Sequence, residues 1–228
     1  MNEKDRDEMP WTEKQWERFL RRSEVRSAKF QELFETLRDH PDQEEIISHE
    51  MGWDDPPERD DDFPDFDPNE MIVEPTEEEM QEYMERHDRD LHAISAYERA
   101  FAYTLSVHNA LKDFFREDNS DADEALAEAI GQSGIIGAKI AGGHGMGYED
   151  DVLCGNICCC KRSLEAADRC LGELERAKAL GAAPREVIEP LITEGREVRR
   201  LVAEWITELR GRVWWDSQER GKGTGEKT

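Results

Sequence analysis

The sequence lacks any stretch of apolar residues long enough to cross a membrane. Its least polar segment, GIIGAKIAGG, is short and contains Lys139, whereas a spanning helix needs about 20 mostly apolar residues. The first residues, MNEKDRDEMPW, contain no apolar core of the kind that marks a signal peptide. We therefore expect a cytoplasmic protein that does not enter a membrane.

Cysteines are few and unsuited to pairing with one another. There are five, which is an odd number, and Cys158, Cys159 and Cys160 are consecutive. On a helix these three side chains point in different directions and cannot form disulfides among themselves. The pattern indicates reduced thiols in a reducing compartment rather than a secreted disulfide scaffold.

Positive charge is also scarce. Lys and Arg number 30 against 55 Asp and Glu, so the formal net charge is -25 at pH 7. This charge repels phosphate backbones and anionic lipid headgroups. It excludes direct nucleic-acid binding as a leading function and favours a protein partner or a homo-oligomer.

No segment shows the alternating pattern of a β-strand, and apolar residues recur at helical spacing almost everywhere. The sequence predicts an all-α protein. Residues 76–215 contain four helical segments joined by short connections, which predicts an antiparallel four-helix bundle. We expect residues 1–53 to form a helical pair docked on this bundle, residues 54–75 to form an acidic linker, and residues 216–228 to form a disordered tail.

The N-terminal pair has clear boundaries. The first helix is predicted over residues 12–39, ending before Pro41, and the second ends at Gly52. The first helix has an apolar stripe that we expect to be buried, made of Trp16, Phe19, Leu20, Phe30, Leu33, Phe34 and Leu37.

The linker is marked by its charge. Residues 54–90 hold 17 Asp and Glu against three Arg, and residues 54–75 carry too few apolar side chains to form a core of their own. Thr76 and Glu79 then form a capping-box pattern, which predicts that a helix begins near Glu77.

The bundle helices are predicted from their stripes. The first runs to Arg116, with a break near residues 87–91, and its inward stripe includes Phe101, Leu105, His108 and Leu111. The second is capped by Asp121 or Asp123 and is followed by a flexible glycine-rich loop over residues 142–147. The third, over residues 149–180, has a seven-residue repeat. Pro184 opens the last helix at its first position, and the helix continues to about Trp215.

No complete catalytic or ligand signature occurs, so the sequence favours a non-enzymatic protein without a cofactor. The alternative is a copper or zinc site. Cys154 and Cys158 are four residues apart and share a helix face, and His144 and Met146 precede them as further soft ligands. The spacing resembles that of copper-storage bundles, but those proteins line the core with cysteines from several helices, and here every cysteine lies on one.

Three functions therefore stay open. The leading one is a helical-bundle protein that acts through protein-protein contacts. The second is a soft-metal or redox protein that uses Cys154 and Cys158. The third is an acidic mimic of nucleic acid that occupies a basic partner.

Overall fold

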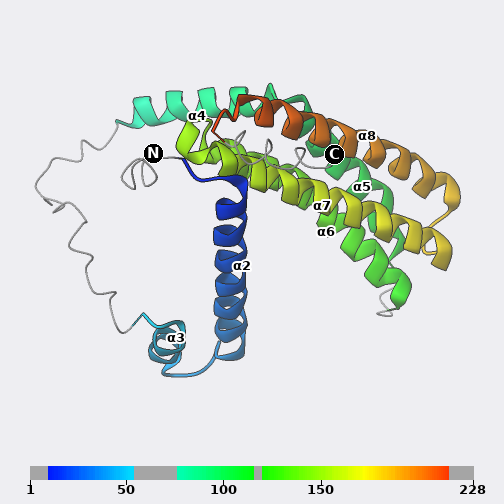
Figure 1. Cartoon of the computed structure of the whole chain (residues 1–228). Helices are drawn as coiled ribbons and strands as arrows, with labels where there is room; N and C mark the ends of the chain where they lie inside the picture. Colours follow the sequence, from blue (N-terminus) through cyan, green and yellow to red (C-terminus); the bar gives the residue numbers. More distant parts are fainter. Residues whose placement is uncertain (1–9, 54–75, 116–119, 216–228) are drawn as a thin grey trace, which may run out of the picture. The chain divides into compact units, whose positions relative to one another are not determined.

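The computed structural model describes residues 10–53, 76–115 and 120–215, and all regular structure in these ranges is helical (Figure 1). The all-α prediction is confirmed. The chain divides into two compact units, one made of residues 1–16 and 84–228 and the other of residues 17–83. The predicted linker over residues 54–75 and the predicted tail over residues 216–228 lie outside the described residues.

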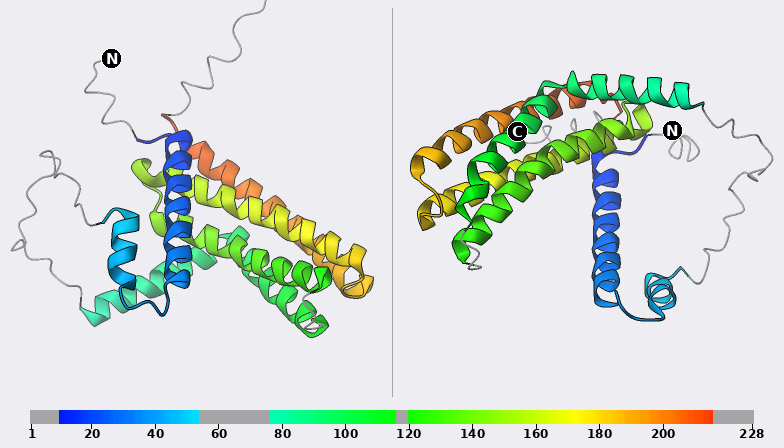
Figure 2. Two further views of the ribbon diagram at one scale, coloured as in Figure 1. Left: turned by 90° about the horizontal axis from the view of Figure 1, so that it is seen from below. Right: turned by 180° about the vertical axis from the view of Figure 1, so that it is seen from behind.

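The larger unit is built on α5 (Ser95–Leu111), α6 (Asp121–Met146), α7 (Asp150–Leu180) and α8 (Arg185–Arg212). The helix α6 packs on α5 and α7, and α8 packs on the same two helices, so the four surround one core (Figures 1 and 2). The largest fully buried side chains come from all four helices and include Tyr103, Leu111, Leu126, Ile136, Ile140, Leu153, Ile157, Leu174, Ile188 and Leu209.

Small residues let α6 and α7 approach closely, as the Gly and Ala content of α6 predicts. A Cβ atom on Gly143 would lie 2.6 Å from the Oδ1 atom of Asn156. Ser163 of α7 is buried and donates a 2.8 Å hydrogen bond to the carbonyl oxygen of Ile136 on α6. The close approach is therefore fixed by hydrogen bonding as well as by apolar packing.

The break in the first long helix is two residues later than predicted. The helix α4 (Glu77–His92) ends before Ala93, and α5 begins at Ser95. Ile94 between them has an extended backbone and is buried. A 2.6 Å contact between His92 Nδ1 and Glu98 Oε2 spans the corner. A buried Ile94 thus explains why the chain turns here.

The predicted inward stripe of α5 is correct at Leu111, which is fully buried, and wrong at three other positions. Phe101, Leu105 and His108 are exposed. The buried face consists instead of Ala96, Ala100, Tyr103, Val107 and Leu111. Two alanines on this face let the neighbouring helices come close. Because alanine is small and only weakly hydrophobic, this face is hard to recognise from the hydrophobic pattern of the sequence.

Several helix ends follow local signals. Thr76 and Glu79 form the predicted capping box, with the Thr76 N–H donating to Glu79 Oε2 at 2.9 Å and the Glu79 N–H to Thr76 Oγ1 at 3.2 Å. Ser120 caps α6, rather than Asp121 or Asp123 as predicted. Its side chain accepts a bond from the Asp123 N–H, and serine is a preferred cap. Pro184 lies one position before the first helical residue of α8.

The second unit contains most of α2 (Glu13–Thr36) and all of α3 (Gln43–Met51). Gly52 ends α3 in the left-handed conformation, as predicted. The predicted buried stripe is wrong, because α2 has no buried residue. Within this unit α2 packs beside a helix of only nine residues, which is too short to cover its whole apolar face. Phe19 and Phe34 are each 48% exposed.

None of the described helices is long and apolar enough to cross a bilayer.

Candidate functional site

The predicted soft-metal residues are distributed over two neighbouring helices. Cys154 and Cys158 are both buried on α7. The Cys158 thiol donates to the carbonyl oxygen of Glu13 at 3.4 Å. His144 and Met146 were expected in a flexible loop, but α6 continues through both and ends at Met146. The loop prediction is therefore wrong, because the glycines at 142, 143 and 145 are accommodated within the helix.

His144 and Met146 contact groups other than Cys154 and Cys158. His144 Nδ1 lies 2.7 Å from the hydroxyl of Tyr148, and the centre of its ring lies 4.5 Å from that of His87, with the two rings tilted at 44°. Met146 Sδ accepts a 3.7 Å hydrogen bond from the Cys159 thiol. Among the described residues no group of three or more His, Cys, Asp or Glu side chains is arranged to hold a metal ion. Metal binding through Cys154 and Cys158 stays a prediction.

Glu13 at the start of α2 attaches the N-terminal turn to α7 and α8 within the larger unit. Its carboxylate accepts two 2.7 Å hydrogen bonds from Arg210 and lies 3.7 Å from Lys161 Nζ. Burial alone would raise the pKa of Glu13, but the hydrogen bonds and charges of Arg210 and Lys161 lower it below its ordinary value. This carboxylate is a structural anchor.

A hollow of about 660 Å³ opens where the α4–α5 corner, the end of α6 and the end of α8 meet. Its lining combines two aromatic rings, Tyr148 and Trp205, with one cation, Arg212. Its acidic side chains come from two elements, α4 and α8, and they are Asp90, Glu204 and Glu208. It is therefore an aromatic site with more negative than positive charge.

Arg212 lies over both aromatic rings. Its Cζ atom is 5.6 Å from the centre of the Tyr148 ring and 5.8 Å from the Trp205 ring. The two rings meet edge to face at 6.4 Å, and Glu208 accepts a 2.8 Å hydrogen bond from the guanidinium. This arrangement holds a cation by attraction to ring faces and to a carboxylate.

The two titratable rings of the hollow are neutral at pH 7. Burial raises the pKa of the Tyr148 hydroxyl to about 12, with a further contribution from Cys160. Burial lowers the pKa of His144, and the neighbouring His87 lowers it further. Tyr148 therefore keeps its proton and can donate it in the hydrogen bond to His144. The charges in the hollow come from its carboxylates and Arg212.

Of the residues that line the hollow, only His144 was placed in a candidate site from the sequence. Trp205, Glu208 and Arg212 follow one another at spacings of three and four residues and so share a face of α8. That spacing was a usable signal for a cation held beside an aromatic ring. Tyr148 had no such signal, because it lies in the connection between α6 and α7 and reaches Arg212 and Trp205 only through the packing of α7 against α8.

Comparison with known proteins gives no match to a protein-family model, to a curated protein or to a solved structure. The function is therefore inferred from the residues of this chain and their geometry.

Proposed function

We propose that this chain is a non-enzymatic, cytoplasmic protein whose antiparallel four-helix bundle binds another protein. The hollow lined by Tyr148, Trp205 and Arg212 is the binding site, and it accepts a basic side chain of the partner. Consecutive helices α5 to α8 that pack around one core support the bundle arrangement. An odd number of cysteines, three of them consecutive on α7, supports a reducing compartment.

The observation that carries the proposal is the position of Arg212. A guanidinium of the chain itself already lies over Tyr148 and Trp205 and pairs with Glu208. The hollow thus has the chemistry to hold a guanidinium. An incoming arginine could compete with Arg212 for the ring faces, and a lysine could use the same surface less effectively because its charge is compact and strongly hydrated.

The carboxylates add selectivity for positive charge. Glu204 and Glu208 have side chains that are more than half exposed, so they can reach a ligand without first being uncovered. Each contact between exposed charges contributes about 0.2–1 kcal/mol, whereas a cation on an aromatic face contributes about 0.5–2 kcal/mol. We therefore expect Trp205 and Tyr148 to dominate affinity and the carboxylates to attract and orient the cation.

Titration calorimetry with two synthetic peptides tests the proposal. One contains arginines separated by glycine and serine, and the other replaces each arginine by citrulline, which has nearly the same shape but no charge. We expect the arginine peptide alone to bind. Arg212→Ala should tighten binding because it removes the competing guanidinium, and Trp205→Leu should weaken it by about 2- to 30-fold.

Glu208→Gln tests the role of charge in the hollow, and Glu197→Gln is its matched control. Both residues are exposed glutamates on α8, but only Glu208 lines the hollow. Glu208→Gln should weaken peptide binding by about 1.5- to 5-fold, while Glu197→Gln should leave it unchanged. Equal binding of the two peptides, or an Arg212→Ala protein with unaltered affinity, would show that the hollow is not a site for basic side chains.

A further inference from the structure

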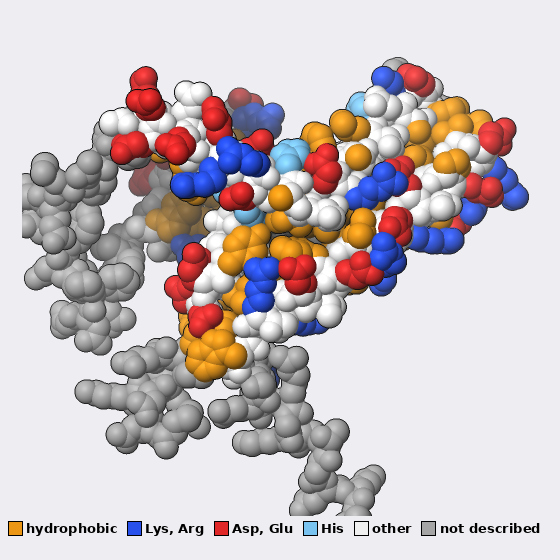
Figure 3. Space-filling view, turned by 90° about the horizontal axis from the view of Figure 1, so that it is seen from above, with side chains coloured by type: hydrophobic (Ala, Val, Ile, Leu, Met, Phe, Trp, Pro, Cys, Tyr) orange, Lys and Arg blue, Asp and Glu red, His pale blue; other side chains and the backbone are white. Residues whose placement is uncertain are grey.

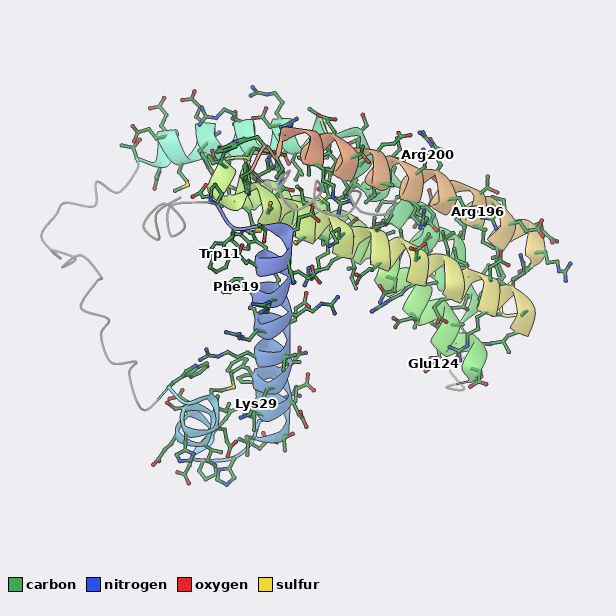
Figure 4. The ribbon with its side chains drawn as sticks, viewed as in Figure 1. Trp11, Phe19, Lys29, Glu124, Arg196 and Arg200 are labelled. Carbon is green, nitrogen blue, oxygen red and sulfur yellow. The ribbon has the colours of Figure 1, made fainter. Side chains whose placement is uncertain are left out.

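The helix α2 carries a stripe of positive charge that contrasts with the acidic chain. Arg18, Arg22, Arg26 and Lys29 follow one another at spacings of four, four and three residues, so they share one face of the helix. From Arg18 to Lys29, with both ends included, there are five basic residues and a single acidic one, Glu24. Each side chain of the stripe is exposed, and Phe19 and Lys29 are shown on α2 in Figure 4.

An apolar groove borders this stripe. Phe30 of α2 lies 5.7 Å from the ring of Trp53 beyond α3, and these residues, with Met51 and Arg26, line a hollow of about 270 Å³. Phe30 is 37% exposed and Trp53 is 49% exposed. Arginine beside exposed aromatic rings is the composition that protein interfaces favour. The face of α2 is therefore suited to bind a surface that is acidic and partly apolar.

We infer that a second copy of this chain is the partner, with the α2 stripe of one copy placing an arginine in the aromatic hollow of the other. This inference rests on the proposed function of the hollow. The two surfaces are complementary in charge: the hollow presents three carboxylates and two ring faces, and α2 presents exposed guanidinium groups. Arg212 shows the geometry that an arginine from α2 would adopt.

The net charge of -25 does not prevent this contact. Repulsion between whole molecules is screened beyond about 8 Å at physiological ionic strength, whereas groups in direct contact are screened less. Figure 3 shows another feature of the larger unit, a face on which acidic, basic and hydrophobic side chains are interspersed. Because groups in direct contact are screened less than whole molecules, the contact between copies depends on the local charges of α2 and the hollow.

The assembly would be head-to-tail, because each copy contributes two different surfaces. Such heterologous contacts build rings or open chains rather than simple twofold dimers. This property makes the inference testable with two variants that each lose one surface. R22Q/R26Q removes two charges from the stripe, and E204Q/E208Q removes two from the hollow. Glutamine preserves helix propensity in all four positions.

Sedimentation velocity of the full-length protein should show association beyond a dimer as concentration rises. Each double variant alone should be monomeric, with self-affinity reduced roughly tenfold or more. An equimolar mixture of the two should form a single heterodimer, since R22Q/R26Q retains an intact hollow and E204Q/E208Q retains an intact stripe. The matched control R38Q/R169Q removes the same charge outside α2 and outside the hollow, and it should associate like the parent protein.

Other results separate this inference from the proposed function. A parent chain that stays monomeric while its hollow still binds the arginine peptide would overturn the second copy as partner and leave the proposed function standing. A monomeric chain whose hollow binds no arginine peptide would overturn both. Association that persists equally in R22Q/R26Q and R38Q/R169Q would show that α2 does not make the contact.

Discussion

Gly195 of α8 lies directly against Tyr103 of α5, so that a Cβ atom added to the glycine would be 2.5 Å from the tyrosine hydroxyl oxygen. The same hydroxyl is 3.5 Å from the Cys170 thiol on α7. Tyr103 is fully buried. Three helices therefore meet at one hydroxyl group, and the absence of a side chain at Gly195 makes the contact possible.

Gly195→Ala should destabilise the protein by about 1–3 kcal/mol, because the new methyl group overlaps the Tyr103 ring and Leu171 in a packed core. Urea unfolding followed by circular dichroism measures the change. The matched control is Gly172→Ala on α7, where an added Cβ meets nothing within 4 Å. That substitution should stabilise the helix by up to about 1 kcal/mol. Equal effects of the two substitutions would contradict the contact.

Two leucines on α5 test which face of this helix is buried. Leu111 is fully buried, and Leu105 is 50% exposed. Leu111→Ala should cost about 2–5 kcal/mol of unfolding free energy, whereas Leu105→Ala should cost less than about 0.5 kcal/mol. Denaturant titration of both variants decides the question. A larger loss in Leu105→Ala would place Leu105 in the core, where the sequence predicts it.

The ion pair between Glu13 and Arg210 should make stability depend on pH. The folded protein lowers the pKa of Glu13, so the stabilisation is present above the ordinary value of 4.5 and is lost as pH falls through the lower folded value. Glu13→Gln should cost roughly 1 kcal/mol at pH 7, because the site is half-buried and part of the interaction is screened.

Thermal unfolding at pH 7 and at acidic pH checks this linkage. The difference between the parent protein and Glu13→Gln should shrink as the pH falls below 4.5. A double-mutant cycle with Arg210→Gln isolates the pair. A difference that stays constant with pH would mean that the carboxylate charge does not stabilise the N-terminal turn.

Metal content tests the alternative function at the buried cysteines. Protein purified under reducing conditions should contain well under one equivalent of copper or zinc by elemental analysis. Changing Cys154 and Cys158 together to serine should leave any trace metal unchanged. Stoichiometric metal that is lost in the double variant would instead identify a soft-metal protein, with His144 and Met146 as the next ligands to test.

The sequence by itself determined the all-helical class and several helix ends. The capping box of Thr76 and Glu79 and the left-handed Gly52 are settled by groups within a few residues of one another. The extent of the cysteine helix, α7, also follows from its seven-residue repeat, because helical periodicity is a local property of the chain.

Only the tertiary structure decided which faces are buried and where the candidate site lies. Ala96 and Ala100 of α5 are buried while Phe101 is exposed. The reason is that α6 and α8 both pack on α5, and their close approach to it favours small side chains over large ones. The apolar stripe of α2 is exposed because burial requires a long neighbouring helix as well as an apolar stripe. Tyr148 and Arg212 are 64 residues apart in sequence, and the packing of α8 against α7 brings ring and guanidinium together.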